Sequence, residues 1–430
     1  MAYFNSKVKK VSLWQANGGR PVVSPDGKYV AYDYKGSDQM YDIRLALIDR
    51  PDRYIDLTAG HPTLPQRNNG NVGFHPQWPT VPIIVFSSEA PAPHYLDTIP
   101  QMGDPGIGLF CNLWAMNVST RRVYQLTNYP IKMTFIDGIV AQGIVFPRFS
   151  TDGGTLLWTR KYADGGGISI GNSWGRWRLS WAPFSVSRGV PSLGTETTLY
   201  DPDVATSGVG NYVVSTAGFF PATDFVLFAG NHGGQHECNM DLYLLDASVH
   251  LAAGGVGSAG ITNLMPAWGA STWEEGSAIC PVAVSGGGVG GGFGYKICYM
   301  SNITSPYGLD YNLDWIGQEV WRELWYMNTD GGNKAQLTKF NRYRPVTLGE
   351  VVGNGGLGPG ASLDDSGENG GEGVYDEFIR PYGRAHPAVM SFTPDGLSIF
   401  VTVAGEFNAP YPIETETLIA IYRIDLNELL

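Results

Sequence analysis

The sequence is short of basic residues and of long apolar runs. Lysine and arginine number 28 against 40 aspartates and glutamates, so the formal net charge is −12. Because a chain of this charge repels a phosphate backbone, we expect no nucleic-acid partner. No apolar stretch approaches the roughly 18 residues that a membrane-spanning helix needs, so no membrane span is expected.

Cysteine is scarce too. The chain has four cysteines: Cys111, Cys238, Cys280 and Cys298. They show no Cys-x-x-Cys spacing and therefore no zinc or redox motif. Cys280 and Cys298 flank a glycine-rich hairpin and would form either a disulfide or, in a reducing compartment, two buried thiols. Residues 1–10 lack the apolar middle of a secretory signal, which favours the cytoplasm unless the sequence is a mature exported form. Localisation stays open.

The long amphipathic stripes of helices are also missing. Instead, 57 glycines and 28 prolines divide the chain into short runs rich in valine, isoleucine, tyrosine and tryptophan. Hydrophobic residues make up 43% of the chain, which suffices for a large core. Short apolar runs between turn residues are typical of an all-β protein.

One spaced motif recurs along the chain. Leu113–Asn117 (LWAMN) is followed after seven residues by Gln-Leu-Thr at 125–127, and Leu324–Asn328 (LWYMN) is followed in the same way by 336–338. Looser copies occupy 45–58 and 242–262. Each copy indicates a strand, a tight turn and a second strand, and such recurrence is typical of a repeat architecture.

A second element precedes these copies. The turn Ser24–Gly27 (SPDG) is echoed at 150–153 and 393–396, with short apolar strands on both sides. Proline sets φ at the first corner, aspartate bonds back to the backbone, and glycine accepts the left-handed position. The two elements together predict a unit of four strands, A to D, joined by tight A–B and C–D turns.

Six such units can be placed on the chain, at approximately 20–58, 70–127, 143–200, 212–264, 276–338 and 386–426. The last unit lacks strand D, while the strand-like segment 8–14 has no unit of its own. We therefore predict one domain over 1–430, a six-bladed β-propeller of four-stranded antiparallel blades closed by an N-terminal strand, with a long insertion at 341–385.

These motifs resemble the WD40-like (PD40) repeats of TolB-type propellers over nearly the whole chain. The resemblance implies a β-propeller and a general role in binding, in a group that includes partner-binding modules, domains attached to peptidases and oligogalacturonate lyases. Phe74–Gln77 (FHPQ) and His386-Pro387 resemble parts of those lyases, which hold a metal with a histidine-rich cluster at the latter place. This chain has Gly383 and Ala388 where further ligands would be expected.

The predicted strand order sorts the connections by face. A–B and C–D turns lie on one face, and B–C and D–A connections on the other. The long connections are mostly of the second kind: 88–111, 161–175, 230–240, 301–320 and 341–385. Because loops beyond ~12–15 residues in a compact fold are usually functional or disordered, we expect the binding site on this face. Exceptions on the opposite face are 285–294 and 252–260.

Several groups on the elaborated face could bind a metal or carry out catalysis. His232, His236 and Glu237 could bind a metal, although two intervening glycines favour a loop whose histidines bond to backbone. His75 and His386 would join them if their rings pointed into the channel. The acidic residues of 364–377 fail the EF-hand spacing and indicate a solvated loop, with calcium as the alternative.

If the protein is an enzyme, its candidate catalytic residues are Glu274, Glu275, Arg384 and His386 near the channel mouth. The alternative is a structural ion pair. Candidate ligand-binding residues are Trp174, Arg176, His75 and Glu89, with the exposed indole stacking on a sugar ring or a partner side chain.

The favoured hypothesis is a non-enzymatic propeller, a scaffold or binding module that recognises a protein or glycan partner through the long loops of one face. It could assemble as a homo-oligomer or within a larger complex, and it needs no cofactor. The alternative is a carbohydrate-active enzyme, a polysaccharide lyase or hydrolase that could depend on a divalent metal.

Overall fold

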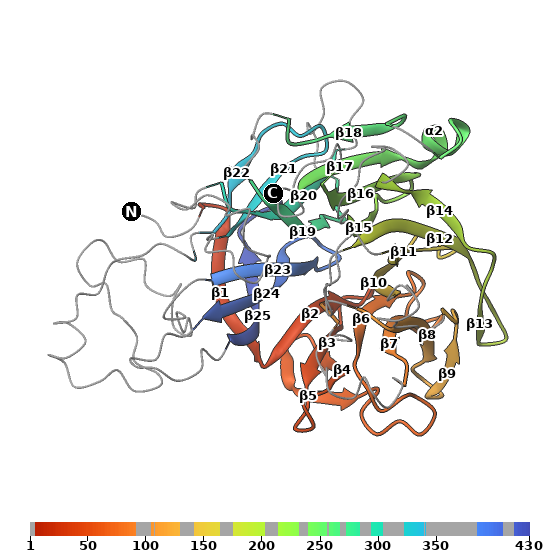
Figure 1. Ribbon diagram of the computed structural model, residues 1–430. Coiled ribbons are helices and arrows are strands. Elements are labelled where there is room, and N and C mark those ends of the chain that lie inside the picture. The colour runs from red at the N-terminus through yellow and green to blue at the C-terminus, as the bar shows by residue number, and fades with distance from the viewer. Residues whose placement is uncertain are drawn as a thin grey trace, which may run out of the picture.

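The structure is a computed structural model of the 430-residue chain. It describes residues 5–91, 105–106, 108–129, 142–163, 175–202, 214–231, 240–255, 258–266, 272–283, 294–303, 322–338, 340, 385–406 and 417–430. Within these residues the strands form six antiparallel sheets, arranged as the blades of a propeller (Figure 1). The expected fold class, a six-bladed β-propeller, is confirmed.

The first three blades follow the chain from strand to strand. Blade 1 contains β2 (Gly18–Val23), β3 (Tyr29–Lys35), β4 (Tyr41–Leu47) and β5 (Arg50–Asp56). Blade 2 contains β6 (Asn69–Phe74), β7 (Ile83–Glu89), β8 (Cys111–Asn117) and β9 (Arg122–Gln125). Blade 3 contains β10 (Gly143–Phe149), β11 (Thr155–Ala163), β12 (Arg176–Ser187), β13 (Val190–Leu193) and β14 (Thr197–Tyr200). Because β13 and β14 both pair along one edge of β12, this blade is also four strands wide.

The other three blades continue the pattern. Blade 4 contains β15 (Val214–Phe219), β16 (Phe225–Gly230), β17 (Asp241–Asp246) and β18 (Ile261–Asn263), with helix α2 (Ala247–Ala252) between its last two strands. Blade 5 contains β19 (Glu274–Ile279), β20 (Lys296–Ser301), β21 (Glu323–Asn328) and β22 (Ala335–Gln336). Blade 6 contains β23 (Ala385–Phe392), β24 (Ser398–Glu406), β25 (Thr417–Leu426) and β1 (Val8–Ala16).

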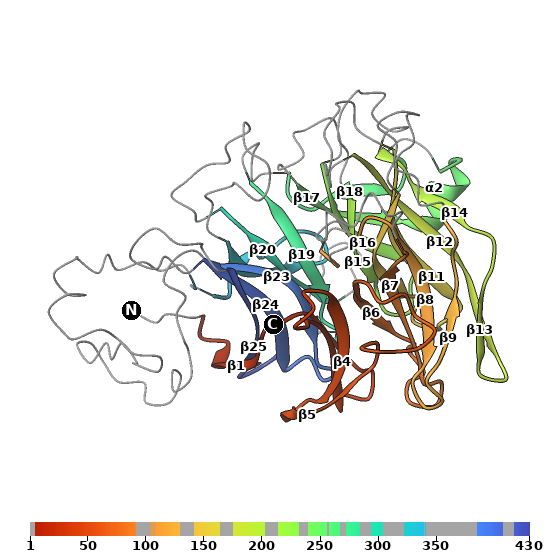
Figure 2. The same cartoon turned by 60° about the horizontal axis from the view of Figure 1, so that its bottom comes forward.

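The N-terminal strand closes the ring, as expected. β1 is the outer strand of blade 6 and pairs antiparallel with β25, from Val8 opposite Leu426 to Ala16 opposite Ala420 (Figure 2). The innermost strands then contact one another in a closed circle, in the order β2, β6, β10, β15, β19, β23 and back to β2. Within the described residues, the two ends of the chain therefore meet in blade 6 and close the ring.

The repeated Leu-Thr motif fastens strand C to strand D. In blade 5, Leu324 N donates to the Thr338 hydroxyl at 3.0 Å, and that hydroxyl donates to the Glu323 carboxylate at 2.8 Å. The corresponding threonines are Thr58, which bonds Ile43 N and Asp42, and Thr127, which bonds Leu113 N and Asn112. The motif recurs because each motif threonine uses its hydroxyl as acceptor and donor at once.

Blade 4 achieves the same join with different residues. Leu264 N donates to Leu242 O at 2.9 Å, the bond that Leu337 N makes to Leu324 O in blade 5. Leu264 therefore takes the place of the motif leucine in this blade, just beyond the range 242–262 expected for this copy. Asn263 replaces the threonine and donates to Asp241 at 2.8 Å.

Each innermost strand is interrupted by a β-bulge at the same place. The register shifts lie between Gly19 and Val22 in β2, and at the corresponding positions of β6, β10, β15, β19 and β23. The first bulged residue has a positive φ in four of these strands, at Arg20 (49°), Asn71 (55°), Phe146 (54°) and Gly276 (56°). A bulge frees a backbone N–H from the ladder, so each blade must satisfy that donor in another way.

Candidate functional site

The long connections gather at one end of the propeller. Strands pair in chain order within each blade, so B–C and D–A connections leave from the end at which strands A and C begin. Between strand bounds, the connections at this end include 90–110, 164–175, 231–240, 302–322, 337–384 and 407–416. A–B and C–D connections are short except 280–295 and 247–260. We call the first end the loop face.

Buried and half-buried polar pairs hold the strand ends at the loop face. Asp42, Asn112, Asp241 and Glu323 all stand at the start of a strand C, and each accepts a hydrogen bond from the end of strand D. Glu89, at the end of β7, accepts from Asn68 Nδ2 at 2.7 Å. The loop face therefore begins on a framework whose polar groups are already paired.

The two candidate carboxylates, Glu274 and Glu275, open β19 at this face. Glu274 is fully buried and accepts from the Ser301 hydroxyl at 2.7 Å. Burial raises the pKa of Glu274 to about 8, against the opposing effect of the Ser301 bond. The Glu274 carboxyl is therefore largely protonated at neutral pH.

Glu275 belongs to a different environment. The Trp273 indole donates to its carboxylate at 3.1 Å, and the Arg322 guanidinium carbon lies 3.9 Å from the centre of the Trp273 ring. Burial raises the pKa of Glu275, and the charge of Arg322 opposes this. Trp273 thus lies between an acid and a cation, an arrangement suited to holding a polar ligand or to locking the blade.

His75 and Glu89 stand at opposite ends of blade 2. His75 follows β6 in the A–B turn, where its N–H donates to Ile83 O, while Glu89 ends β7 at the loop face. The His75 ring packs against Phe149 at 5.2 Å and Phe184 at 6.0 Å, and burial lowers its pKa. The structure does not bring these two side chains together.

Arg176 is the first residue of β12, at the loop face, and pairs with Ala163. Trp174, His232, His236, Glu237 and Arg384 lie outside the described residues, as does the acidic segment 364–377. The backbone of His386 pairs with Ala404 inside β23. In the part of the chain that the structure describes, no three His, Cys, Asp or Glu side chains gather as a metal site.

Sequence reasoning missed the polar residues that satisfy the bulges. The fifth residue of strand B accepts the freed N–H of the next blade at three junctions: Arg20 N to Thr402 (2.7 Å), Asn71 N to Asp33 (3.2 Å) and Thr216 N to Thr159 (3.2 Å). Asp33 is fully buried and also pairs with Arg20. A polar residue at the fifth position of an otherwise apolar strand B was the available signal.

A cation on the innermost strands was also missed. Arg148, on β10, donates from Nη1 to Val72 O of β6 at 3.4 Å and to Pro147 O at 3.0 Å. A Cβ added to Gly218 of β15 would meet its Cγ at 3.5 Å, so Arg148 touches three successive innermost strands. Burial lowers the pKa of Arg148 to about 10.

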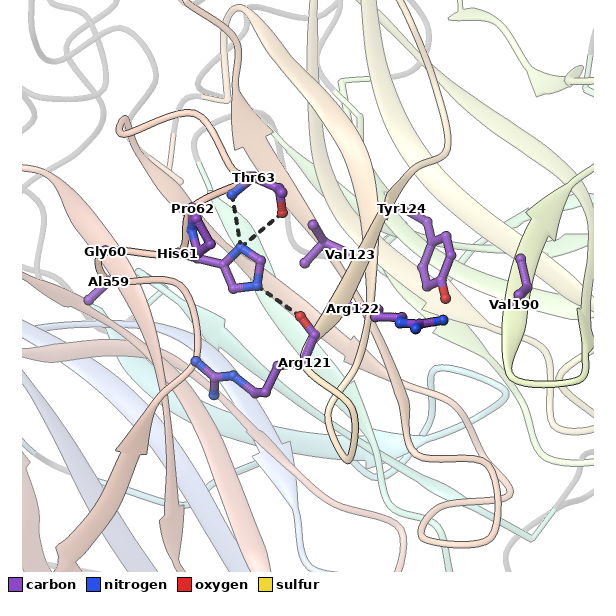
Figure 3. A pocket seen from close by; sticks show the side chains of 10 residues that line it. All are labelled: Ala59, Gly60, His61, Pro62, Thr63, Arg121, Arg122, Val123, Tyr124 and Val190. Atoms are coloured by element: carbon purple, nitrogen blue, oxygen red, sulfur yellow. Dashed lines mark hydrogen bonds between the residues drawn. The ribbon is translucent and has the colours of Figure 1, made fainter.

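A pocket of about 680 Å³ lies on the rim, away from these groups. Its lining comes from the segment after β5, from β9 with its preceding turn, and from β13: Ala59, Gly60, His61, Pro62, Thr63, Arg121, Arg122, Val123, Tyr124 and Val190 (Figure 3). His61 Nε2 lies 2.8 Å from Arg121 O. Because a carbonyl only accepts, Nε2 carries the proton, and Nδ1 accepts from the Thr63 hydroxyl at 3.2 Å.

Comparison with solved structures finds remote similarities. TolB from Acinetobacter baumannii is 14% identical with a TM-score of 0.37, over 74% of this chain and 53% of that protein. An oligogalacturonate lyase in complex with manganese is 12% identical with a TM-score of 0.43, over 100% and 99%. The β-propeller domain of the Trilobed protease from Pyrococcus furiosus is 10% identical with a TM-score of 0.38, over 96% of each chain.

The identities and TM-scores of these matches are low. The chain spans only about half the length of the Acinetobacter TolB. No family model and no curated protein matches the sequence. Activity and partners must therefore be argued from this chain's own residues.

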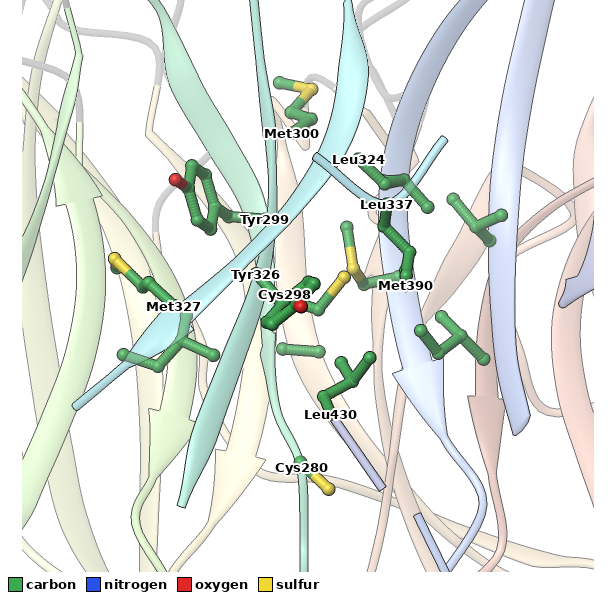
Figure 4. Close-up of a cluster of buried hydrophobic side chains, with 14 of the residues drawn as sticks. Cys280, Cys298, Tyr299, Met300, Leu324, Tyr326, Met327, Leu337, Met390 and Leu430 are labelled. Carbon is green, nitrogen blue, oxygen red and sulfur yellow. The ribbon is translucent and has the colours of Figure 1, made fainter. Parts of the chain in front are cut away.

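The two hairpin cysteines belong to the core. Cys280 and Cys298 are buried free thiols, in a cluster that joins blades 4, 5 and 6 with β1 and includes Met327, Met390 and Leu430 (Figure 4). Burial raises the pKa of both thiols. Of the two states expected from the sequence, the structure contains the buried thiols.

No helix in the described ranges has the length and apolar character to span a membrane.

Proposed function

We propose that the protein is a non-enzymatic binding module that recognises a protein or glycan partner through its loop face. The observation that carries the proposal is the uneven distribution of the connections: the insertions collect at one end, on strands whose ends are held by buried and half-buried hydrogen bonds. Variable loops on a rigid scaffold are the usual construction of a recognition surface. Arg176, Glu89 and Trp174 are the proposed contacts, because they stand at or beside this end.

Loop shortening tests this proposal. Residues 94–104, in the B–C connection of blade 2, are replaced by Gly-Ser-Gly, and residues 284–293, in the A–B connection of blade 5, are replaced in the same way as the matched control. Binding to immobilised neutral and uronate polysaccharides, and to partners captured from the native source, is measured by biolayer interferometry.

We expect the first variant to lose at least tenfold in affinity and the control to bind like the unaltered protein. Both variants must keep the wild-type melting temperature for the comparison to count. Loss in the control alone, or full binding by the first variant, would assign recognition to another surface.

One observation favours a carbohydrate-active enzyme as the second candidate. Glu274 and Glu275 are adjacent at the loop face, and burial raises the pKa of both carboxyls. A carboxyl that keeps its proton at neutral pH can act as a general acid. Arg384 and His386 would assist in this reading, and His232, His236 and Glu237 would supply a metal.

Two measurements decide between the candidates. Elemental analysis of the purified protein reports a bound metal, and the ultraviolet absorbance of an unsaturated product reports uronate cleavage. For an enzyme, Glu275→Gln should reduce turnover at least a hundredfold. Absence of both metal and cleavage would leave the binding module.

A further inference from the structure

The outer edge of blade 2 is an open strand edge. β9 pairs with β8 through Tyr124 opposite Ala115, and Leu126 N donates to Leu113 O. Since hydrogen bonding alternates along an antiparallel strand, Val123 and Gln125 direct their N–H and C=O groups away from β8. No described residue bonds to those outward groups.

The matching edge of blade 5 is covered. Gln336 stands opposite Trp325 as Gln125 stands opposite Trp114. The outward carbonyl of Gln336 accepts from Asn5 Nδ2 at 3.1 Å, and Leu337 O accepts from Asn5 N at 3.2 Å. In blade 5 the edge of the fourth strand thus accepts one side-chain and one main-chain hydrogen bond from another segment of the chain.

The rim pocket lies along the open edge. Val123 faces His61 and Thr63 on one side of β9, while Arg122 and Tyr124 extend toward Val190 on the other (Figure 3). The segment after blade 1 and the β12–β13 turn of blade 3 therefore flank β9. An added strand would lie between them and place alternate side chains on the two sides.

The walls are positively charged, although the chain as a whole carries −12. Arg121 donates to the carbonyls of Asp56 and Leu57 at 2.7 and 2.9 Å, and Arg122 extends along the wall. Within the described residues neither guanidinium forms an ion pair with a carboxylate. The pocket lining contains no acidic residue. Charge complementarity selects an acidic occupant.

We propose that β9 is a docking edge for an extended acidic segment of a partner protein, which adds to blade 2 as a fifth strand. Main-chain bonds to Val123 and Gln125 supply affinity, and glutamate or aspartate side chains facing Arg122 supply selectivity. Val190, which is 46% exposed, offers an apolar contact on the same side. This surface includes part of the D–A connection after β5 but none of the proposed contacts Arg176, Glu89 and Trp174, so its test is independent of the test of the proposed function.

Two capped, fluorescein-labelled heptapeptides test the inference, one alternating glutamate and valine and the other lysine and valine. Fluorescence anisotropy at low salt should show the acidic peptide binding at least tenfold more tightly. Arg122→Glu should reverse this order. Gln125→Pro, which removes an outward N–H, should weaken the acidic peptide at least tenfold. Arg53→Glu, the same charge change on the exposed edge strand β5, is the matched control and should change nothing.

Amide hydrogen exchange distinguishes strand addition from a general electrostatic attraction, because only strand addition protects the backbone N–H groups of the edge strand. Exchange in residues 118–129 should slow when the acidic peptide is added, and exchange in β5 should not. Equal binding of both peptides, or slowing elsewhere but not in 118–129, would overturn the proposal. So would self-association abolished by Arg122→Glu, because the edge would then belong to a second copy of the chain. Unchanged circular dichroism establishes that each variant is folded.

Discussion

Single residues in this propeller are placed for the hydrogen bonds they can satisfy. Thr338 is fully buried, accepts from Leu324 N and donates to Glu323. Its hydroxyl therefore satisfies both a backbone N–H of strand C and a buried carboxylate. Thr58, Thr127 and Thr338 all use the hydroxyl in this double role, which accounts for the threonine in each of the three motifs.

Thr338→Val should lower the free energy of unfolding by about 1–3 kcal/mol, because two buried groups lose their partner while the shape is kept. Urea denaturation at pH 7 measures the change. Thr197→Val, at an exposed position of β14, is the control and should stay within about 0.5 kcal/mol. Equal effects at the two positions would show that the motif threonine contributes by shape alone.

The buried Glu274 carboxyl makes stability depend on pH. Its pKa is raised in the folded state to about 8 from an ordinary 4.5. Between these values the folded protein holds a proton that the unfolded chain has released, so stability is greatest below pH 4.5 for this group and falls as pH rises toward 8. Other carboxylates, such as Glu196 beside Arg160, have lowered pKa values and oppose the trend at low pH.

Glu274→Gln removes this titration and should flatten the stability profile between pH 5.5 and 8. The variant should gain on the wild type as pH rises, by an amount on the order of a few kcal/mol. Urea midpoints at the two pH values give the comparison. Parallel profiles for variant and wild type would place the proton on another group.

At the scale of elements, the bulged innermost strands decide how blades meet. Gly276, the first bulged residue of β19, has a φ of 56°, and an added Cβ would lie 2.9 Å from Ala388 O on β23. The turns depend on side chains in a similar way: Tyr29 N donates to the Ser24 hydroxyl and Ser398 N donates to the Thr393 hydroxyl, in each case from the second residue after Pro-Asp-Gly. These local rules repeat from blade to blade.

Gly276→Ala should strain the backbone and bring the new Cβ into collision with Ala388 O. Gly60→Ala should cause the same backbone strain without any collision. Gly60 has a φ of 64° and no atom within 4 Å of an added Cβ. Each should lose about 1–2 kcal/mol for the left-handed backbone, and Gly276→Ala a further ~1–3 kcal/mol for the displaced blade. Thermal unfolding measures both. Equal losses of stability in the two variants would show that blade 6 can move away from β19 at this point without cost.

At the scale of the molecule, closure couples the two ends of the chain. Asn427 N donates to Lys7 O at 2.8 Å, and Lys7 Nζ reaches Leu429 O at 3.0 Å, so β1 lies beside the C-terminus. The core cluster across blades 4 to 6 contains Val8 and Val11 of the same strand. Removing β1 therefore opens a sheet edge and exposes part of a core.

Deletion of residues 1–16 should expand the molecule and cause aggregation, because blade 6 loses its outer strand. A permuted chain that begins at Gly18 and carries residues 5–16 after Leu430 through a short glycine–serine linker should recover the compact form. Small-angle scattering and gel filtration distinguish the two. A compact, monomeric deletion variant would show that three strands suffice for blade 6.

The fold followed from the sequence because its determinants are local and repeated. The Leu-Trp-x-Met-Asn spacing, the Pro-Asp-Gly turns and the missing last strand together predicted six blades and the N-terminal closure, which the sheets confirm. The candidate site did not follow in the same way. His75 and Glu89 belong to the same blade but stand at opposite ends of it. Asp33 and Thr402 looked like ordinary strand residues.

The sequence by itself therefore determined the number of blades, their strand order and the end at which the connections gather. Only the tertiary structure decided which groups meet across the fold: the Asp33 carboxylate with Asn71 N between blades 1 and 2, Trp273 with Arg322 within blade 5, and the edge of β9 with its two flanking segments. The physical reason is the separation along the sequence of the residues that interact. Turns and strand pairs depend on neighbours in the chain, whereas inter-blade contacts depend on how twisted sheets pack, and no local pattern encodes that angle.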